Sequence, residues 1–266
     1  MSAKHTRPRR AIRDVQSSFD SRGIGIDKVG IKNIRYPIVV LDRSNTIQHT
    51  IASINMYVDL PKQFKGTHMS RFVEILNEYR GNISIRDYPG ILEKMRERFN
   101  ARSAHLEIEF PYFIEKKSPV THARSLMEYT CTFIGIRNGT GTDFVLIIRV
   151  PVLTLCPCSK EISKYGAHNQ RSFVTVHLRF KGLVWIEEIV TLVEASASGQ
   201  LYSLLKRPDE KYVTEFAYDN PMFVEDVVRE VARKLKKNDR IVSFSVEAEN
   251  LESIHNHNVY AYVESR

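Results

Sequence analysis

The sequence predicts an α+β fold built from two copies of a ββααββ unit. Its apolar residues alternate with a period of two, shift to helical spacing and return to a period of two, in the same order twice. The polar segment NGTGTD, residues 138–143, separates the two runs. Hydrophobic residues make up 42% of the 266 residues, enough for a sizeable core. Each unit should form an antiparallel sheet with two helices on one face.

The first unit is expected over residues 31–140, after an irregular basic arm at 1–30. It opens with a β-hairpin rich in β-branched residues and joined by Arg43 and Ser44. Two amphipathic helices and two alternating strands follow. The elements are expected at 34–42, 45–60, 69–81, 88–101, 104–116 and 125–139.

The second unit is expected over residues 141–266 and repeats the same order. Two strands come first, then two helices, then two strands. These elements are expected at 144–155, 172–182, 184–197, 221–238, 240–250 and 257–265. A polar segment, residues 156–172, connects the first two strands.

Composition excludes several classes of protein. The longest apolar run, 144–155, is interrupted by Arg149 and is far shorter than the roughly 20 residues of a membrane helix. The first residues lack the apolar region of a secretory signal, and three cysteines are too few for a disulfide framework, so we expect a cytoplasmic protein. The net charge of +8 raises nucleic-acid binding as a rival function, but no recognisable motif supports it and no nucleic acid is expected.

The connecting segment CPCSKEISKYGAHNQRS carries the clearest chemistry. Gly166 provides the backbone freedom to fold His168 back toward Cys156. A thiolate and an imidazole can share a divalent metal, and a catalytic site then needs one more protein ligand. The alternatives are an inert cysteine and a solvated histidine, and Cys158 is equally a ligand or a structural neighbour.

Acidic residues further along the chain could complete such a site. Glu210 lies between the two helices of the second unit, and Glu225 lies in the first turn of the second helix. Glu252 precedes His255 and His257 in a loop between two strands, a pattern typical of a general acid/base cluster. For any one of these carboxylates the alternative is an ordinary surface charge.

Five motifs closely resemble type IB GTP cyclohydrolase I, a family of the tunnelling-fold superfamily. The motifs are CPCSKEISKYGAHNQRS, THMSRF, RPDEKYVTE, NPMFVED and ENLESIHNHNVYA. The resemblance implies that Cys156 and His168 bind a metal with Glu210, and that Glu225 anchors the purine ring. It also implies that Glu252 and His255 belong to the catalytic pocket, with His255 as proton donor and Glu252 as its partner.

The resemblance further implies a metal-dependent hydrolase that converts GTP and water to 7,8-dihydroneopterin triphosphate and formate, at the start of folate and pterin biosynthesis. The metal could be zinc, manganese or iron. The family's units assemble into barrels, so we expect a homotetramer with active sites at subunit interfaces. The rival within the fold is another purine or pterin enzyme, including a cyclohydrolase that yields a cyclic phosphate.

The triphosphate of GTP needs cationic partners. His68 and Arg71 in THMSRF lie at a helix N-terminus, which favours anions, and we expect them to bind substrate. Several other basic residues remain available. They are Lys160, Lys164, Arg171, Lys206 and Arg207.

Overall fold

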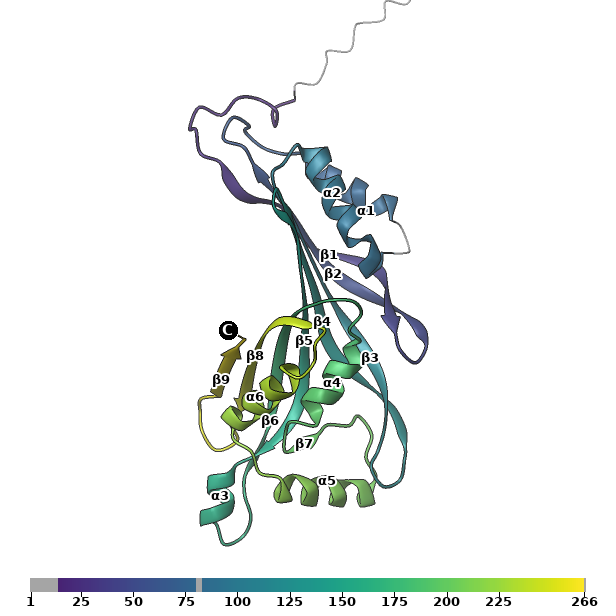
Figure 1. Ribbon diagram of the computed structural model, residues 1–266, viewed down its shortest axis with the longest axis vertical. Coiled ribbons are helices and arrows are strands. Elements are labelled where there is room, and N and C mark those ends of the chain that lie inside the picture. Colours follow the sequence, from purple (N-terminus) through teal and green to yellow (C-terminus); the bar gives the residue numbers. More distant parts are fainter. Residues whose placement is uncertain (1–13, 80–82, 266) are drawn as a thin grey trace, which may run out of the picture.

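The computed structural model describes residues 14–79 and 83–265 and contains both ββααββ units (Figure 1). Residues 1–13 of the expected N-terminal arm lie outside the described residues. The rest of the arm is shorter than expected, because β1 begins at Ile26 and pairs with β2 from there. The arm therefore ends before residue 30, where its boundary was predicted.

The first unit follows the predicted order. A β-turn whose backbone N–H groups, from Ser44 and Asn45, donate to the Asp42 carboxylate closes the first hairpin. A left-handed residue, Asn100, ends the second helix. The elements are β1 (Ile26–Asp42), β2 (Thr46–Leu60), α1 (Ser70–Glu78), the 3₁₀ turn η1 (Ile85–Asp87), α2 (Tyr88–Phe99), β3 (Ala104–Lys117) and β4 (Arg124–Asn138).

The second unit repeats this order with three additional elements. Its main elements are β5 (Gly141–Leu155), β6 (Asn169–Phe180), α4 (Ile186–Glu194), α6 (Val224–Leu235), β8 (Ile241–Leu251) and β9 (Val259–Glu264). The additions are α3 (Pro157–Ile162), β7 (Gly199–Gln200) and α5 (Arg207–Asp219). Periodicity did not reveal α5 because its aromatic residues are exposed and only Asp209 and Ala217 are buried.

All main strands join one antiparallel sheet in the order β1-β2-β3-β4-β5-β6-β8-β9. The two units are continuous because β4, the last strand of the first, pairs with β5, the first strand of the second. Residues directly opposite one another in a sheet share a face. One such row is buried from end to end, and it consists of Ile54, Ile108, Phe133, Leu146, Leu178 and Phe244.

The helices cover this apolar face. In Figure 1, α1 and α2 lie over the upper half of the sheet, and α4 and α6 lie over the lower half. The resulting core is one cluster that includes residues of both units. The expectation of helices on one face is thus confirmed.

The opposite face of the sheet carries several charged side chains among apolar ones, and no helix covers it in the described residues. It carries Glu109, Arg149, His177 and Glu247, and the Arg149 guanidinium lies 3.8 Å from the centre of the Phe173 ring. Within the described residues, β1 and β9 each have one unpaired edge. None of the helices in this part of the chain combines the length and apolar character needed to span a bilayer.

Candidate active site

The segment 156–172 folds back on itself, as its glycine predicted. The Cys156 N–H donates to the His168 carbonyl at 3.1 Å, and the His168 N–H donates to Ser159 Oγ at 3.2 Å. Gly166 has φ +129°, a conformation that residues with a Cβ rarely adopt. Cys156 also caps α3, since its Sγ accepts from the Ser159 N–H at 3.4 Å. The loop therefore brings Cys156 and His168 together.

A pocket of about 250 Å³ lies beside this loop. The ends of β6 and β8 form one side, and the segment leading into α6 forms the other. Its lining contains five of the predicted site residues, namely Cys156, His168, Glu225, Glu252 and His255. These residues are separated by up to about 100 positions in sequence, so the fold brings distant polar side chains together in this pocket.

Two buried polar atoms in this pocket face each other without a hydrogen bond. His168 Nδ1 lies 3.9 Å from Glu252 Oε2, and neither atom has a partner within the described residues. Gln170 Nε2 donates to the other carboxylate oxygen, Glu252 Oε1, at 3.4 Å, and Gln170 Oε1 is also unpaired. Buried polar atoms are nearly always satisfied in folded proteins. These atoms are therefore available to a water or to another bound polar group.

The histidines of the ENLESIHNHN loop lie at the pocket mouth. The exposed rings of His255 and His257 stack with centroids 5.1 Å apart. In the described structure, Glu252 makes no hydrogen bond to His255; its nearest imidazole partner is His168. The predicted pairing of Glu252 with His255 is therefore not formed in this single chain.

Glu225 lies in the first turn of α6, as predicted. The capping role at this helix start belongs to its neighbour, because the Asp226 carboxylate accepts the Phe223 N–H at 3.1 Å. Glu225 is exposed and lines the pocket. Its carboxylate is thus available to a ligand.

Three predicted residues lie outside the pocket. Glu210 is exposed on α5 and is not part of the lining. His68 and Arg71 flank the start of α1, as expected, but α1 and the α3 loop lie toward opposite ends of the long axis of the molecule (Figure 1). Within residues 14–79 and 83–265, no group of three His, Cys, Asp or Glu side chains is close enough to hold a metal.

Asp209, next to Glu210, determines where α5 begins. Its buried carboxylate accepts the N–H groups of Val120, Thr121 and Lys206 and the Thr121 hydroxyl, at 2.6–2.9 Å. Although burial acts to raise the pKa of Asp209, the hydrogen bonds from Thr121, Lys206 and Val120 hold it well below the ordinary value. The helix that carries Glu210 is thereby fixed to the turn between β3 and β4.

Sequence reasoning missed two amides in the pocket, Gln170 and Asn250. They are only 6% and 2% exposed. A signal was available, because both occupy strand positions that point to the apolar face and would ordinarily carry an apolar residue. Asn250 follows Val246 and Ala248 on the buried side of β8.

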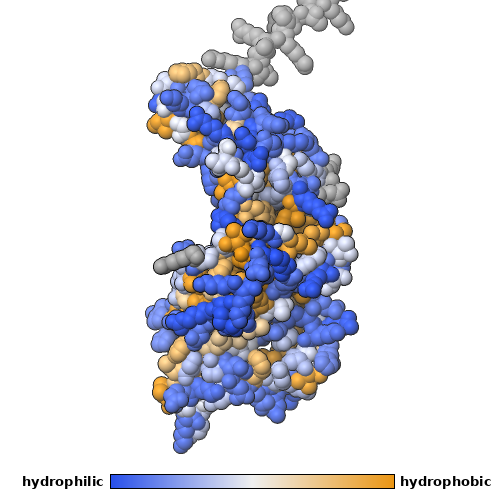
Figure 2. Space-filling model, in the orientation of Figure 1, coloured by the Kyte–Doolittle hydropathy of each residue, from blue (hydrophilic) through white to orange (hydrophobic). Residues whose placement is uncertain are grey.

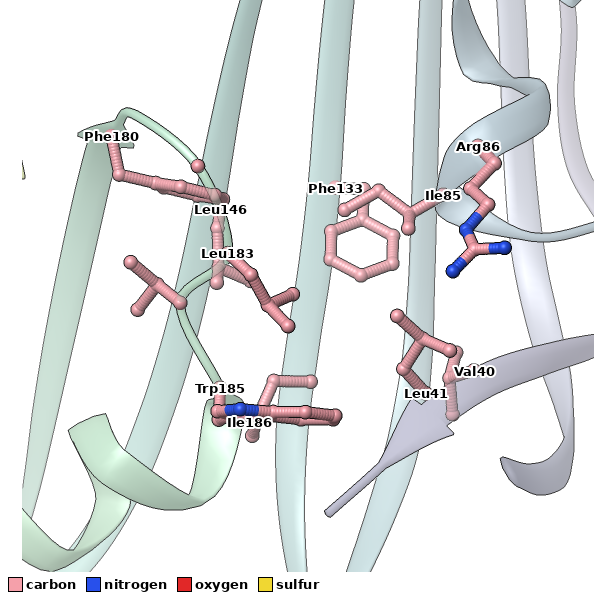
Figure 3. A pocket seen from close by; sticks show the side chains of 12 residues that line it. Val40, Leu41, Ile85, Arg86, Phe133, Leu146, Phe180, Leu183, Trp185 and Ile186 are labelled. Atoms are coloured by element: carbon pink, nitrogen blue, oxygen red, sulfur yellow. The ribbon is translucent and has the colours of Figure 1, made fainter. Parts of the chain in front are cut away.

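A larger apolar cavity of about 320 Å³ lies elsewhere, between the two helix pairs (Figure 3). Aromatic side chains of Phe133, Phe180 and Trp185 line it, and Arg86 is its only charged lining residue. Figure 2 shows apolar side chains gathered near the middle of this face of the molecule. The cavity contains no acid/base pair, so we assign the chemistry to the smaller pocket.

Comparison with known proteins identifies the family. A family model described as type I GTP cyclohydrolase folE2 matches residues 12–261. The chain is 61% identical over 252 residues to GTP cyclohydrolase FolE2 of Syntrophobacter fumaroxidans, covering 94% of this chain and 98% of that protein. The chain belongs to the FolE2 family.

A second FolE2 relative, from Syntrophus aciditrophicus, is 63% identical over 251 residues, again 94% of this chain and 98% of the relative. FolE2 is the type IB cyclohydrolase, so the resemblance inferred from the five motifs is confirmed. Among solved structures, uricase from Arthrobacter globiformis matches with a TM-score of 0.52 and 12% identity, covering 91% of this chain and 93% of that one. This likeness shows that the FolE2-family chain shares its fold with a urate oxidase.

Proposed function

We propose that the protein is a GTP cyclohydrolase that converts GTP and water to 7,8-dihydroneopterin triphosphate and formate, which supplies folate or pterin biosynthesis. Membership of the FolE2 family over residues 12–261 carries this proposal. The pocket supports it, because a carboxylate, an imidazole and a thiol line one cavity. In the reaction, water adds at C8 of the purine, C8 leaves as formate, and the ribose carbons reclose as the pterin ring.

Glu225 is the proposed anchor of the guanine ring. Guanine presents N1–H and the 2-amino group side by side, so one carboxylate can accept both hydrogen bonds with charge-assisted strength. Glu225 lines the pocket and Asp226 performs the capping, which leaves the Glu225 carboxylate free for this contact. His255, at the mouth, is the proposed proton donor to the leaving nitrogen.

Two residues of the pocket, Cys156 and His168, could contribute ligands to a divalent metal. The thiol of Cys156 and the imidazole of His168 are typical zinc ligands, and Glu210 is the proposed third ligand. The unpaired Nδ1 of His168 supports a bound group at this point. When bound, zinc, manganese or iron would lower the pKa of a coordinated water. Glu252, buried beside His168, is the proposed proton acceptor.

A comparison of two cysteine variants tests the metal ligands. Cys156→Ala should lose most of its bound metal, measured by elemental analysis of the purified protein. Cys158→Ala is the matched control, because Cys158 is exposed and does not line the pocket, and it should keep its metal. Full metal content in Cys156→Ala would remove Cys156 from the ligand set.

We also propose that the working protein is a homo-oligomer, a tetramer, whose active sites combine residues of two chains. His68 and Arg71 lie far from the pocket within one chain, and Glu210 lies outside its lining. Tyr212 and Phe216 stack on the uncovered side of α5 at 45% and 43% exposure. Exposed aromatics and two open sheet edges are features that a second copy of the chain would cover.

Two assays test these proposals. Purified protein with GTP and Mn²⁺ or Zn²⁺ should release formate and a product that becomes a fluorescent pterin after oxidation. Metal-loaded protein that forms neither product would overturn the proposed function.

A second assay tests the shared site. Arg71→Ala and Glu225→Ala chains are purified separately and after co-expression. Each should be inactive alone, and the mixture should regain about one quarter of the sites. The Arg71→Ala/Glu225→Ala double variant, expressed under the same conditions, serves as the inactive control. No recovery of activity in the mixture would contradict a shared site.

A further inference from the structure

Three polar side chains interrupt the apolar face of the sheet, and one of them, Asn250, lines the pocket. Thr154 of β5, Ser172 of β6 and Asn250 of β8 are 0%, 0% and 2% exposed. Thr154 Oγ1 and Ser172 Oγ share a hydrogen bond of 2.7 Å, and the Ser172 hydroxyl donates to Asn250 Oδ1 at 2.6 Å. Polar groups in such a place cost stability unless every one of them is satisfied.

This chain of hydrogen bonds does not use the side-chain NH₂ group of Asn250. Asn250 Oδ1 is engaged by Ser172, whereas Nδ2 makes no hydrogen bond within residues 14–79 and 83–265. Asn250 is also part of the pocket lining. In this arrangement Ser172 donates to Asn250 and Thr154 donates to Ser172, which leaves the NH₂ group of Asn250 available to a molecule in the pocket.

The same pocket contains the Glu225 carboxylate, so its polar lining offers an acceptor and a fixed neutral donor. The Watson–Crick edge of guanine is complementary to such a pair. Its N1–H and 2-amino groups donate, and the adjacent O6 accepts. Adenine carries an amino group in place of O6, which would meet the amide NH₂ donor to donor.

We propose, on the basis of the proposed function, that Asn250 is a specificity-determining residue that donates a hydrogen bond from Nδ2 to O6 of the guanine ring. Ser172 and Thr154 are positioning residues that hold the amide in this orientation. A half-turn of the amide would place its carbonyl oxygen against O6 and repel the base. Sites that hydrogen-bond a substrate group discriminate strongly against analogues lacking it, because a buried polar group is then unpaired.

The test compares GTP with 6-thio-GTP, whose sulfur is a much weaker acceptor than O6. The wild-type protein should prefer GTP by about tenfold or more in kcat/KM, and Asn250→Ala should bring that ratio close to one. Ser172→Ala should reduce the ratio in part, since the amide is then free to turn. Asn258→Ala is the matched control, because this exposed asparagine lies outside the pocket, and it should keep the wild-type ratio.

A second variant makes the test independent of the cavity that alanine leaves. Asn250→Asp preserves shape but presents only acceptors, so the kcat/KM ratio of GTP to 2,6-diaminopurine riboside triphosphate, whose 6-amino group donates, should fall relative to wild type. The analogue lacks N1–H and loses that contact with Glu225 in both proteins, so the change in the ratio reports on Asn250 and not on Glu225. Unchanged ratios in both Asn250 variants, with wild-type protein active on GTP, would overturn this inference alone. Wild-type protein inactive on GTP would overturn the proposed function as well.

Discussion

His168 Nδ1 and Glu252 Oε2 face each other at 3.9 Å, both buried and both without a hydrogen bond within the described residues. The Glu252 side chain is only 7% exposed, so water does not readily satisfy its carboxylate. The carboxylate is nevertheless held in place by Gln170 through its other oxygen. Such a group is oriented but has one unpaired oxygen, which supports the proposed role of Glu252 as a proton acceptor.

Replacing this carboxylate should affect the chemical step more than binding. Glu252→Gln keeps the shape of the side chain but cannot take up a proton, so we expect kcat to fall about 100-fold or more with a small change in KM. Steady-state kinetics with GTP, alongside metal analysis of the same sample, would measure this. Glu161→Gln, on the exposed side of α3, is the control and should behave as wild type. An equal kcat in the two variants would exclude Glu252 as a proton acceptor.

A buried ion pair links β3 of the first unit to α4 of the second unit. Lys116 of β3 donates to Glu194 of α4 at 2.7 Å and to the Leu201 carbonyl at 2.8 Å, and the Tyr129 hydroxyl donates to the same Glu194 oxygen. Burial lowers the pKa of Lys116, although the Glu194 charge opposes this. Removing one partner of a buried ion pair leaves the other charge buried and unpaired, which is strongly destabilising.

We therefore expect Lys116→Met to reduce the free energy of unfolding by about 3–5 kcal/mol. Chemical denaturation at fixed protein concentration would measure it. Arg124→Met is the matched control, because Arg124 pairs with Glu115 in solvent, at 64% and 52% exposure, and should cost less than about 1 kcal/mol. Similar losses of unfolding free energy in the two variants would show that the buried pair contributes no more to stability than the exposed pair.

Two half-buried histidines should make stability depend on pH. Burial lowers the pKa of both His105 and His177; nearby Lys28 and Arg179 act in the same direction, whereas Glu107, Asp59 and Glu247 oppose it. Because the folded-state pKa lies below the unfolded value of about 6.5, the unfolded chain binds protons first as the pH falls. Their contribution to stability is complete above about pH 6.5 and is lost as the pH falls through the folded-state pKa.

Thermal melts from pH 8 to pH 5 should therefore show a falling melting temperature below about pH 6.5. The double variant His105→Gln/His177→Gln should show a shallower slope over that range. His49→Gln, an exposed strand position, should leave the slope unchanged. A double variant with the wild-type slope would assign the acid sensitivity to other groups.

Most of the secondary structure followed from local patterns. The alternation that predicted a strand at 104–116 corresponds to β3, and the helical spacing at 88–101 corresponds to α2. Both elements bury one side, and burial of one side is what a sequence pattern records. The helix α5 has almost no buried side, since its start depends on Asp209 contacting Val120 and Thr121 about 90 positions away. Nothing in its own periodicity carries that information.

The sequence by itself determined the family, the repeated unit and the identity of the residues that hold reactive groups, because motifs such as CPCSKEIS and local periodicity are properties of short segments. The tertiary structure alone decided which of these groups meet. It placed His168 against Glu252, kept the start of α1, with His68 and Arg71, away from the α3 loop, and joined Ser172 to Asn250 across 78 positions. Such contacts depend on the register and order of strands in one sheet, and register is settled by the packing of the whole apolar face.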